Sequence, residues 1–571
     1  MKCTKCGAEL PEGAKTCESC KTPVEGQPES GGKNKRIVPI LIGGAAVLAA
    51  GAFAAVKMTE KDPKEVVIGA FETIYETEKP MPVEELFGVS GFADTALTTS
   101  VENGLTLKLD SASDEMINAY AGSGLRFESK NDVENKKSSF DMEVIYNGMD
   151  LAGFTGYYGD EILMLGLPGL SERVFTLDLG EGLEERIVNS PTVGPLLEEN
   201  NVNVAEISTY LSEMIEAQEQ AVEEGKTAFD FGALLERYKE GCKAQDNFEA
   251  AWIVEKGDKA DYEINGKNVS CRGYSVTISK DAIINFLRES SDFFLQDETL
   301  KQDFLKQLEF SVNLSNLMGA QIEDSLTAEQ VQQETYDELK ASVDEVITEL
   351  EASLEDVQMQ VYVDKKGSLA ALEGTTAIHS PEGTAPETVQ VSFSALLKGG
   401  SYPTQNMDAK IELVEGEDTV ALSVSKAGTY DGKKLTSDIK ADVTSVGSSV
   451  ITLSYSGAYN SEDGSYSLSL NGSAPDSQLF EAAAKGVIDE LEKGKAVHLS
   501  IDELNISVMD DLYSAVLSGE YYLRPLSGEV VSLEGTQMDM LAATEEDWSN
   551  VLLEIVFGAM ALGGQVSAPV E

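Results

Sequence analysis

Histidine and tryptophan are almost missing from this chain, which contains two of each among its 571 residues. The two histidines, His379 and His498, stand in unrelated sequence contexts. The sequence has no Gly-x-Ser-x-Gly elbow, no His-Glu-x-x-His helix and no complete glycine motif for a nucleotide. We therefore expect no histidine-based nucleophilic or metal-assisted reaction, and we predict no catalytic or cofactor-binding residue.

Positive charge is also scarce. The chain has 43 basic residues against 99 acidic ones, which gives a formal net charge of -56. Such a field repels DNA, RNA and anionic lipid, and it favours divalent cations or basic peptides, although solubility alone also explains it. No nucleic-acid partner is expected. A hydrolase that uses a pair of carboxylates stays open, because so many acidic residues hide any particular pair.

Four of the six cysteines fall within the first 20 residues, as the pairs Cys3/Cys6 and Cys17/Cys20. Each Cys-x-x-Cys turn brings two thiolates together, and two such turns complete a closed tetrahedral site for a structural zinc ion. Two disulfides or a redox pair are the alternative. A segment too small for its own core favours the metal, because metal binding supplies its folding energy.

A second feature of the sequence is an uncharged run from Ile37 to Val56, which follows a linker at residues 24–36. Twenty helical residues span about 30 Å, so this run predicts a transmembrane helix. Lys33, Lys35 and Arg36 precede it and favour a cytoplasmic N-terminus with the remaining chain outside the cell. A cytoplasmic location also keeps zinc-binding thiols reduced.

Two further features of this run matter. Ala52-Phe53-Ala54 fits a signal-peptidase site, so a cleaved signal sequence is the competing interpretation. Ala46, Ala50 and Ala54 form a stripe of small residues that would let two helices pair, which makes a homodimer through the membrane segment a further expectation.

The first 23 residues resemble the zinc-ribbon module at the N-terminus of many bacterial membrane proteins. Lys21 departs from the glycine that usually follows the second cysteine pair. With the apolar run behind it, the chain resembles zinc-ribbon membrane proteins of Gram-positive bacteria. That resemblance implies a single-pass protein of the cell membrane with a protein partner, in envelope stress sensing or scaffolding.

Cys242 and Cys271 are separated by 29 residues in the remaining chain. A disulfide between them would stabilise the fold by about 3–4 kcal/mol through the loop that it closes. Two buried free thiols are the alternative.

Much of the chain beyond residue 60 reads as antiparallel strands. Apolar residues alternate with polar ones over 357–363 and over 466–470. Between such runs stand residue pairs that tolerate positive φ and so predict tight hairpins. These pairs are Asn147-Gly148, Asn265-Gly266, Asp431-Gly432 and Asp463-Gly464.

Helical stripes interrupt the strands. One stripe runs from Val204 to Ile215 and another from Leu339 to Leu354, preceded by the capping pair Thr327 and Gln330. A third helix is expected after the strand that ends near Ile278, and a last one near Thr544. We expect all of them to lie over a sheet. The order from about 269 to 425 also looks like the lipoprotein-carrier fold of bacterial envelope proteins.

These patterns predict an α+β fold: a zinc ribbon, one transmembrane helix, and a large extracellular antiparallel sheet covered by helices. The expected regions are a ribbon at 1–23, a linker at 24–36, the membrane helix at 37–56, an α+β region at 60–380, a β-rich meander at 381–474 and a C-terminal α+β region at 475–571. The expected function is non-enzymatic binding of a ligand or partner, with a hydrolase or an apolar-ligand carrier as alternatives.

Overall fold

The computed structural model describes residues 62–75, 81–199, 231–302, 304–305, 328–379 and 388–566. All of them belong to the compact unit that spans Phe53–Glu571. Cys3, Cys6, Cys17, Cys20, the apolar run 37–56 and the helix expected at 204–215 lie outside the described residues, so these stay predictions from the sequence.

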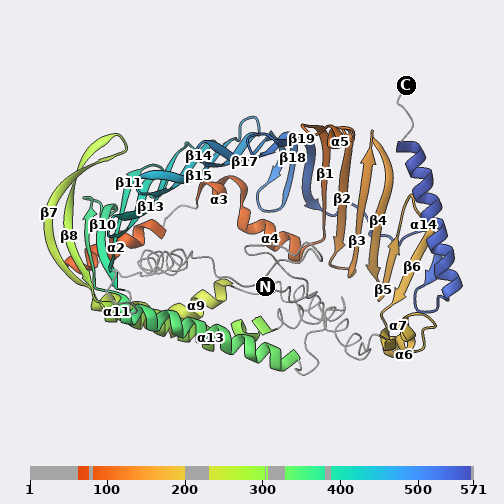
Figure 1. Ribbon diagram of the computed structural model, residues 1–571, viewed down its shortest axis with the longest axis horizontal. Helices are drawn as coiled ribbons and strands as arrows, with labels where there is room; N and C mark the ends of the chain where they lie inside the picture. The colour runs from red at the N-terminus through yellow and green to blue at the C-terminus, as the bar shows by residue number, and fades with distance from the viewer. Residues whose placement is uncertain are drawn as a thin grey trace, which may run out of the picture. The chain divides into compact units, whose positions relative to one another are not determined.

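One hydrogen-bonded sheet of 20 strands dominates the described residues (Figure 1). The first group of strands is β1 (Val101–Ala112), β2 (Ser123–Asp132), β3 (Lys137–Tyr146), β4 (Met149–Gly159), β5 (Ile162–Gly166) and β6 (Arg173–Asp178). A second group follows a helical connection and comprises β7 (Ile253–Ile264), β8 (Lys267–Ile278), β9 (Val357–Val363), β10 (Leu369–His379), β11 (Thr388–Gly399), β12 (Asn406–Glu415), β13 (Asp418–Tyr430), β14 (Lys434–Ser445), β15 (Ser448–Asn460), β16 (Ser465–Ala474), β17 (Ser477–Glu492), β18 (Ala496–Val508), β19 (Tyr513–Pro525) and β20 (Thr536–Asp539).

The first strand of the chain lies in the middle of the sheet. β1 pairs with β2 on one side and with β19 on the other. From β1 the chain runs outward in antiparallel steps to β6, and β20 adds itself parallel to β6. The strands from β7 to β19 form an antiparallel meander that returns to β1. Strands on both sides of the expected boundaries at 380 and 474 therefore pair in the same sheet.

The predicted hairpin turns are confirmed. Asn147 and Gly148 both have positive φ, 50° and 77°, and they connect β3 directly to β4. Asn265 and Gly266 do the same between β7 and β8, with φ of 52° and 67°. Turns of this type match the right-handed twist of the strands, and they need residues that tolerate positive φ.

The described helices are α2 (Pro63–Tyr75), α3 (Pro82–Phe87), α4 (Val89–Thr98), α5 (Glu115–Asn118), α6 (Leu183–Val188), α7 (Val193–Glu199), α9 (Phe231–Gly241), α10 (Ala244–Ala251), α11 (Lys280–Gln296), α13 (Ala328–Ser353) and α14 (Glu545–Val566). The helices expected after Ile278, over 339–354 and near Thr544 are confirmed as α11, α13 and α14. Ser279 caps α11 by accepting a hydrogen bond from the amide of Ala282 at 3.3 Å.

Helices pack against the sheet in several regions. The ring of Phe87 in α3 lies against Tyr459 of β15, with centroids 4.7 Å apart, and Thr95 of α4 donates to the carbonyl of Gly494 at 2.6 Å. α2 and α13 contact β9 or β10, and the aromatic rings of Phe71 and Phe248 both meet Trp252 edge-on, with centroids 5.9 and 5.6 Å from the Trp252 ring. α14 lies beside β6 (Figure 1). The ring of Trp548 in α14 stacks on that of Phe175 in β6, with centroids 5.9 Å apart. These clusters bury large aromatic surfaces and hold the helices in place.

The fold class predicted from the sequence is wrong. The described chain is one very large sheet. Phe87 of α3 covers Tyr459 of β15, but large apolar side chains of β1–β3 and β15–β18 stay exposed. Across the described ranges no helix combines the length and the apolar character needed to cross a membrane. In the same ranges no group of three or more His, Cys, Asp or Glu side chains could hold a metal ion. The described residues therefore do not support the zinc and membrane labels expected from the sequence, and they include neither the four N-terminal cysteines nor the run 37–56.

Candidate functional site

The sheet separates charged from apolar side chains. Successive residues of a strand point to opposite faces, so a registered pair shares one face. Leu105, Phe127 and Met142 are registered neighbours on β1, β2 and β3, and so are Leu107, Leu125 and Val144. On β16, β17 and β18, two further registered rows complete what we call the apolar face. These rows are Leu468, Ala484 and Leu504, and Leu470, Ala482 and Ile506.

No charged side chain lies on the apolar face of β1, β2, β3, β14, β15 or β16, all of which the structure describes completely. On four of these strands every Asp, Glu, Lys and Arg alternates onto the opposite face, and β15 and β16 have no such residue. In β14, Ile439 and Ala441 belong to the apolar face, whereas Lys440 and Asp442 point the other way. This separation is notable in a chain with a net charge of -56.

The apolar face is accessible to solvent. Leu125 is 55% exposed, Met142 44% and Leu468 45%. Soluble proteins rarely leave contiguous apolar surface of this kind uncovered unless it binds a ligand, a partner or a lipid. The apolar face is therefore a candidate binding surface.

The opposite face of β19 and β1–β3 carries ionisable side chains. Glu102 is 3% exposed, and its carboxylate accepts hydrogen bonds from Arg524 Nε at 2.5 Å and from Ser527 Oγ at 2.9 Å. Burial alone would raise the pKa of Glu102, but these hydrogen bonds outweigh it and lower the pKa. This ion pair, in which Glu102 is buried and Arg524 is half-exposed, joins β1 to β19 and has a structural role.

A group of carboxylates follows on β2 and β3. Arg126 pairs with Glu143 and with Asp150, the latter at 3.0 Å. Glu128 and Asp141 lie directly opposite each other in register. Burial raises the pKa of Asp141, and the neighbouring charge of Glu128 raises it further. Two like charges in register repel each other, so this group destabilises the ionised sheet instead of forming a built site.

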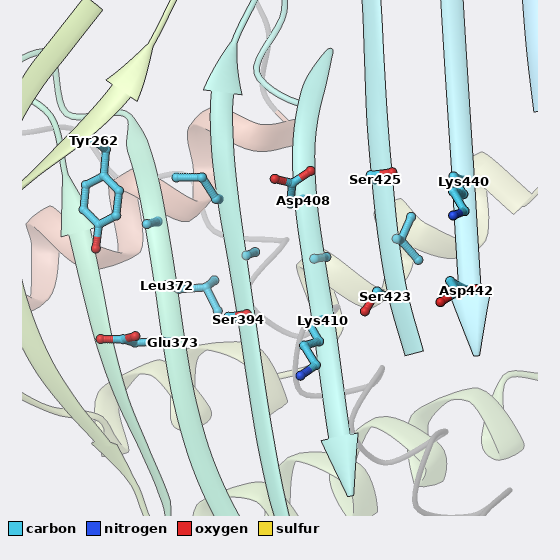
Figure 2. Close-up of a pocket in the computed structure, with 15 residues that line it drawn as sticks. Tyr262, Leu372, Glu373, Ser394, Asp408, Lys410, Ser423, Ser425, Lys440 and Asp442 are labelled. Carbon is cyan, nitrogen blue, oxygen red and sulfur yellow. The ribbon is translucent and has the colours of Figure 1, made fainter. Parts of the chain in front are cut away.

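A hollow of about 450 Å³ opens on the polar face of β10–β14 (Figure 2). We call it the polar hollow, and its polar lining is Tyr262, Glu373, Ser394, Asp408, Lys410, Ser423, Ser425, Lys440 and Asp442. Glu373, Ser394, Lys410, Ser423 and Asp442 form one registered row across five strands. A second hollow of about 510 Å³ shares Glu373, Ser394 and Lys410 with it.

Most charges of the polar hollow already have partners. Asp408 pairs with Lys398, and Lys410 pairs with Glu412. The carboxylate of Asp442 accepts hydrogen bonds from Thr452 at 2.5 Å and Ser449 at 2.8 Å, which lower its pKa. A lowered pKa is the opposite of what a general acid needs at neutral pH.

Tyr262 forms one wall of the polar hollow. It lies on the β7–β8 hairpin, and its ring centroid is 5.1 Å from that of Tyr362. Burial, together with Tyr362 and the charge of Glu373, raises the pKa of Tyr262 to about 12. Its hydroxyl therefore stays neutral. It forms a hydrogen bond with Tyr362 and points toward Glu373 in Figure 2.

The structure leaves the predicted disulfide unformed. Cys242 and Cys271 are free thiols. Cys271 is 1% exposed in β8, and burial raises its pKa. The thiol of Cys242 instead faces the carbonyl of Glu289 at 3.8 Å. The alternative of two free thiols therefore describes these cysteines in the structure.

Neither histidine lies in the polar hollow. Nε2 of His379 is 2.7 Å from a carboxylate oxygen of Glu355, at the end of β10. Nδ1 of His498 is 2.5 Å from Asp489, and this hydrogen bond raises the pKa of His498. Each histidine is a strand residue paired with a carboxylate, on a different part of the sheet.

No pattern in the sequence points to the apolar face or to the polar hollow as a site. The alternation at 466–470 was visible, but alternation does not reveal whether the apolar side is covered. The row that lines the polar hollow comes from five strands, and only their register brings its members together.

Comparison with known proteins adds little. No family model matches the chain, and no curated protein matches it. Among solved structures, a chain described as a CymD monoaromatic hydrocarbon channel aligns with a TM-score of 0.15 and 7% sequence identity, over 78% of this chain and 94% of that one. A TM-score this low carries no argument about fold or function.

Proposed function

We propose that this protein is a non-enzymatic binding protein whose apolar face holds the acyl chains of a lipid-like ligand. One observation carries the proposal: a strongly acidic chain keeps every charge off one face of β1–β3 and β14–β16, and leaves the apolar side chains there exposed. The apolar-ligand carrier considered from the sequence has the same chemistry, although it was expected to bind beneath covering helices.

The energetics favour an elongated apolar ligand. Burying a half-exposed leucine or phenylalanine contributes about 1 kcal/mol, so a ligand that covers six such side chains gains about 6 kcal/mol. An acyl chain gains about 0.8 kcal/mol for each CH₂ group that it buries. Both the gain of the protein and that of the acyl chain come from removing apolar surface from water. A second copy of this chain is a poor occupant, because two molecules that each carry a charge of -56 repel each other.

A carboxylate-dependent hydrolase has less support. Three described carboxylates have a raised pKa. Asp141 and Glu143 lie on an open strand face, where Glu143 is already paired with Arg126. The third, Glu249 of α10, accepts a hydrogen bond from Gln245. In the polar hollow, Asp442 has a lowered pKa and two hydroxyl partners. None of these places offers two free carboxylates that face each other across a bound substrate.

The test introduces negative charge on either face of one strand, β16, and compares the effects on lipid binding. Leu468 and Leu470 of β16 belong to the apolar face, and Ser467 and Ser469 alternate onto the opposite one. We expect the full chain to bind a fluorescent fatty acid only weakly, because the net charge repels its anionic head group, and to bind a fluorescent zwitterionic phospholipid tightly. We expect the L468D/L470D variant to bind the phospholipid at least about tenfold more weakly, because a carboxylate in an apolar contact is costly to desolvate.

The S467D/S469D variant is the matched control. It adds the same charge to the same strand, so its affinity should stay near that of the unchanged chain. Circular dichroism and thermal melting verify that both variants fold. Equal loss in the two variants would contradict the proposal, and so would failure of the unchanged chain to bind fatty acid and phospholipid probes alike. Binding of an apolar peptide without any lipid binding would assign this face to a protein partner.

A further inference from the structure

The polar hollow has two charged side chains that make no hydrogen bond or ion pair with the part of the chain that the structure describes. These are Glu373 on β10 and Lys440 on β14, and they lie at opposite ends of the hollow (Figure 2). Every other charged group in the hollow has a partner: Asp408 has Lys398, Lys410 has Glu412, and Asp442 has Thr452 and Ser449. Besides those two hydroxyls, the charge of Lys440 lowers the pKa of Asp442, and besides burial, the charge of Glu373 raises the pKa of Tyr262, but neither side chain is held in an ion pair within the described ranges. The hollow therefore offers an anion at one end and a cation at the other to a ligand that carries both charges.

The distance between these ends follows from the sheet. Four strand spacings separate β10 from β14, and neighbouring strands lie about 4.8 Å apart, so the two ends are on the order of 19 Å apart. An extended peptide rises by about 3.3 Å for each residue, which makes this the length of roughly six residues.

We propose that the polar hollow binds a short extended peptide with free ends, its terminal ammonium at Glu373 and its terminal carboxylate at Lys440. The ring of Tyr262 stands beside Glu373 (Figure 2), and an aromatic ring next to a carboxylate is a favourable setting for an ammonium group. This inference uses the opposite face of the sheet and does not rest on the proposed binding of acyl chains.

Serine hydroxyls line the floor of the polar hollow. Ser394 lies between Glu373 and Lys410, and Ser423 lies between Lys410 and Asp442, each in register with its neighbours. A hydroxyl both donates and accepts, so a row of serines can bond the amide groups of a peptide that crosses the strands, whatever its side chains. The hollow thus selects for charge and length more than for sequence.

The two ends of the peptide should contribute unequally to the binding free energy. Asp442 stands two residues from Lys440 on the same strand and opposes an incoming carboxylate, whereas Glu373 and the acidic chain as a whole attract an ammonium. The amino end of the peptide should therefore contribute more to binding than the carboxyl end.

The experiment is calorimetric titration of the full chain with the peptide Gly-Ser-Gly-Ser-Gly-Ser in its free, N-acetylated and C-amidated forms. We expect the free peptide to bind, and acetylation to weaken it by about tenfold, since one charge-assisted contact is lost. Amidation should weaken binding less than acetylation does. Raising the salt concentration should also weaken binding.

Variants locate the two ends. E373Q should lose about tenfold in affinity for the free peptide and little for the acetylated one, because substitution and acetylation remove the same contact. K440M should likewise lose affinity for the free peptide and little for the C-amidated one, because substitution and amidation remove the same contact at the carboxyl end. K485M is the control, since Lys485 pairs with Glu503 at 2.7 Å on strands outside the hollow. All three lysine or glutamate positions are on the sheet surface, so melting temperatures near that of the unchanged chain are expected.

Three results with the peptides would overturn this inference. They are equal binding of the free and doubly capped peptides, equal loss in E373Q and K485M, and no measurable binding of any form. Tighter binding of chitohexaose than of the peptide would likewise overturn it and assign the serine floor to a glycan.

Discussion

At the scale of single residues, the carboxylates of this chain divide into two kinds that respond to pH in opposite directions. Asp141 has a raised pKa because of burial and the charge of Glu128, which lies opposite it in register. Asp442 has a lowered pKa because the hydroxyls of Thr452 and Ser449 donate to it. Both lie on strands of the same sheet, so the direction of each pKa shift depends on local surroundings: burial and a like charge at Asp141, hydroxyl donors at Asp442.

The raised pKa of Asp141 predicts a stabilising substitution. The folded state holds the proton of Asp141 more tightly than the unfolded state does, so its contribution to stability is full below the unfolded pKa of about 3.9 and is lost as pH rises through the folded pKa. We expect D141N, which cannot ionise, to melt at a higher temperature than the unchanged chain at pH 7. The difference should vanish near pH 3, which differential scanning calorimetry can measure.

The D442N variant tests the opposite case, a carboxylate whose pKa is lowered in the folded state. The stability that Asp442 contributes is present above its unfolded pKa and is lost as pH falls through its lower folded pKa. This variant should therefore melt at a lower temperature than the unchanged chain at pH 7. A lower melting temperature for D141N at pH 7 would show that the repulsion from Glu128 is not the dominant effect at Asp141.

At the scale of strands, a recurring pair places an aromatic ring over a glycine in the neighbouring strand. Phe140 lies over Gly156, Phe393 over Gly374 and Phe480 over Gly472, each pair in register. A side chain on any of these glycines would meet the ring of its partner. The ring covers backbone that glycine leaves bare, a device that stabilises strongly twisted sheets.

This pairing predicts the effect of a β-branched residue at Gly156. G156V displaces the ring of Phe140, and we expect it to destabilise the fold by about 1–3 kcal/mol, as overpacking does. Chemical denaturation measures the change. The double variant G156V/F140A removes the clash, so its loss should be smaller than the sum of the two single losses. Strict additivity would mean that the ring does not contact position 156.

At the scale of the whole molecule, pairing between remote parts of the chain holds the sheet together. β1 pairs with β19 along eleven registered positions, from Val101 with Pro525 to Ala112 with Ala515. β20 closes the other side by pairing with β6. Pairings that span so much sequence form late and slowly, because the loop between them must close first.

The net charge of -56 predicts how salt acts on the molecule. Repulsion among unpaired carboxylates opposes the compact state, and salt screens it over a Debye length of about 10 Å at 0.1 M. We expect the melting temperature to rise between about 20 mM and about 500 mM NaCl. Sucrose of equal osmolarity separates screening from solute exclusion. A falling melting temperature would mean that local ion pairs such as Arg524 with Glu102 outweigh the global repulsion.

The sequence by itself determined the local elements. Asn147-Gly148 and Asn265-Gly266 specify their hairpins because the turn needs positive φ at neighbouring residues, and the alternation over 357–363 specifies β9 because strand side chains have a period of two. The stripe over 339–354 specified α13 in the same way. These signals depend only on residues close in sequence.

Only the tertiary structure decided which strands are neighbours and which faces are covered. No local signal at Glu102 points to Arg524, and none at Glu373 points to Lys440, because register between remote strands depends on the whole chain. The alternation at Leu468 and Leu470 is the same whether helices cover these leucines or solvent reaches them, so the sheet covered by helices was expected wrongly. The expected disulfide failed for a related reason: spacing in sequence does not place the thiols of Cys242 and Cys271 together in space.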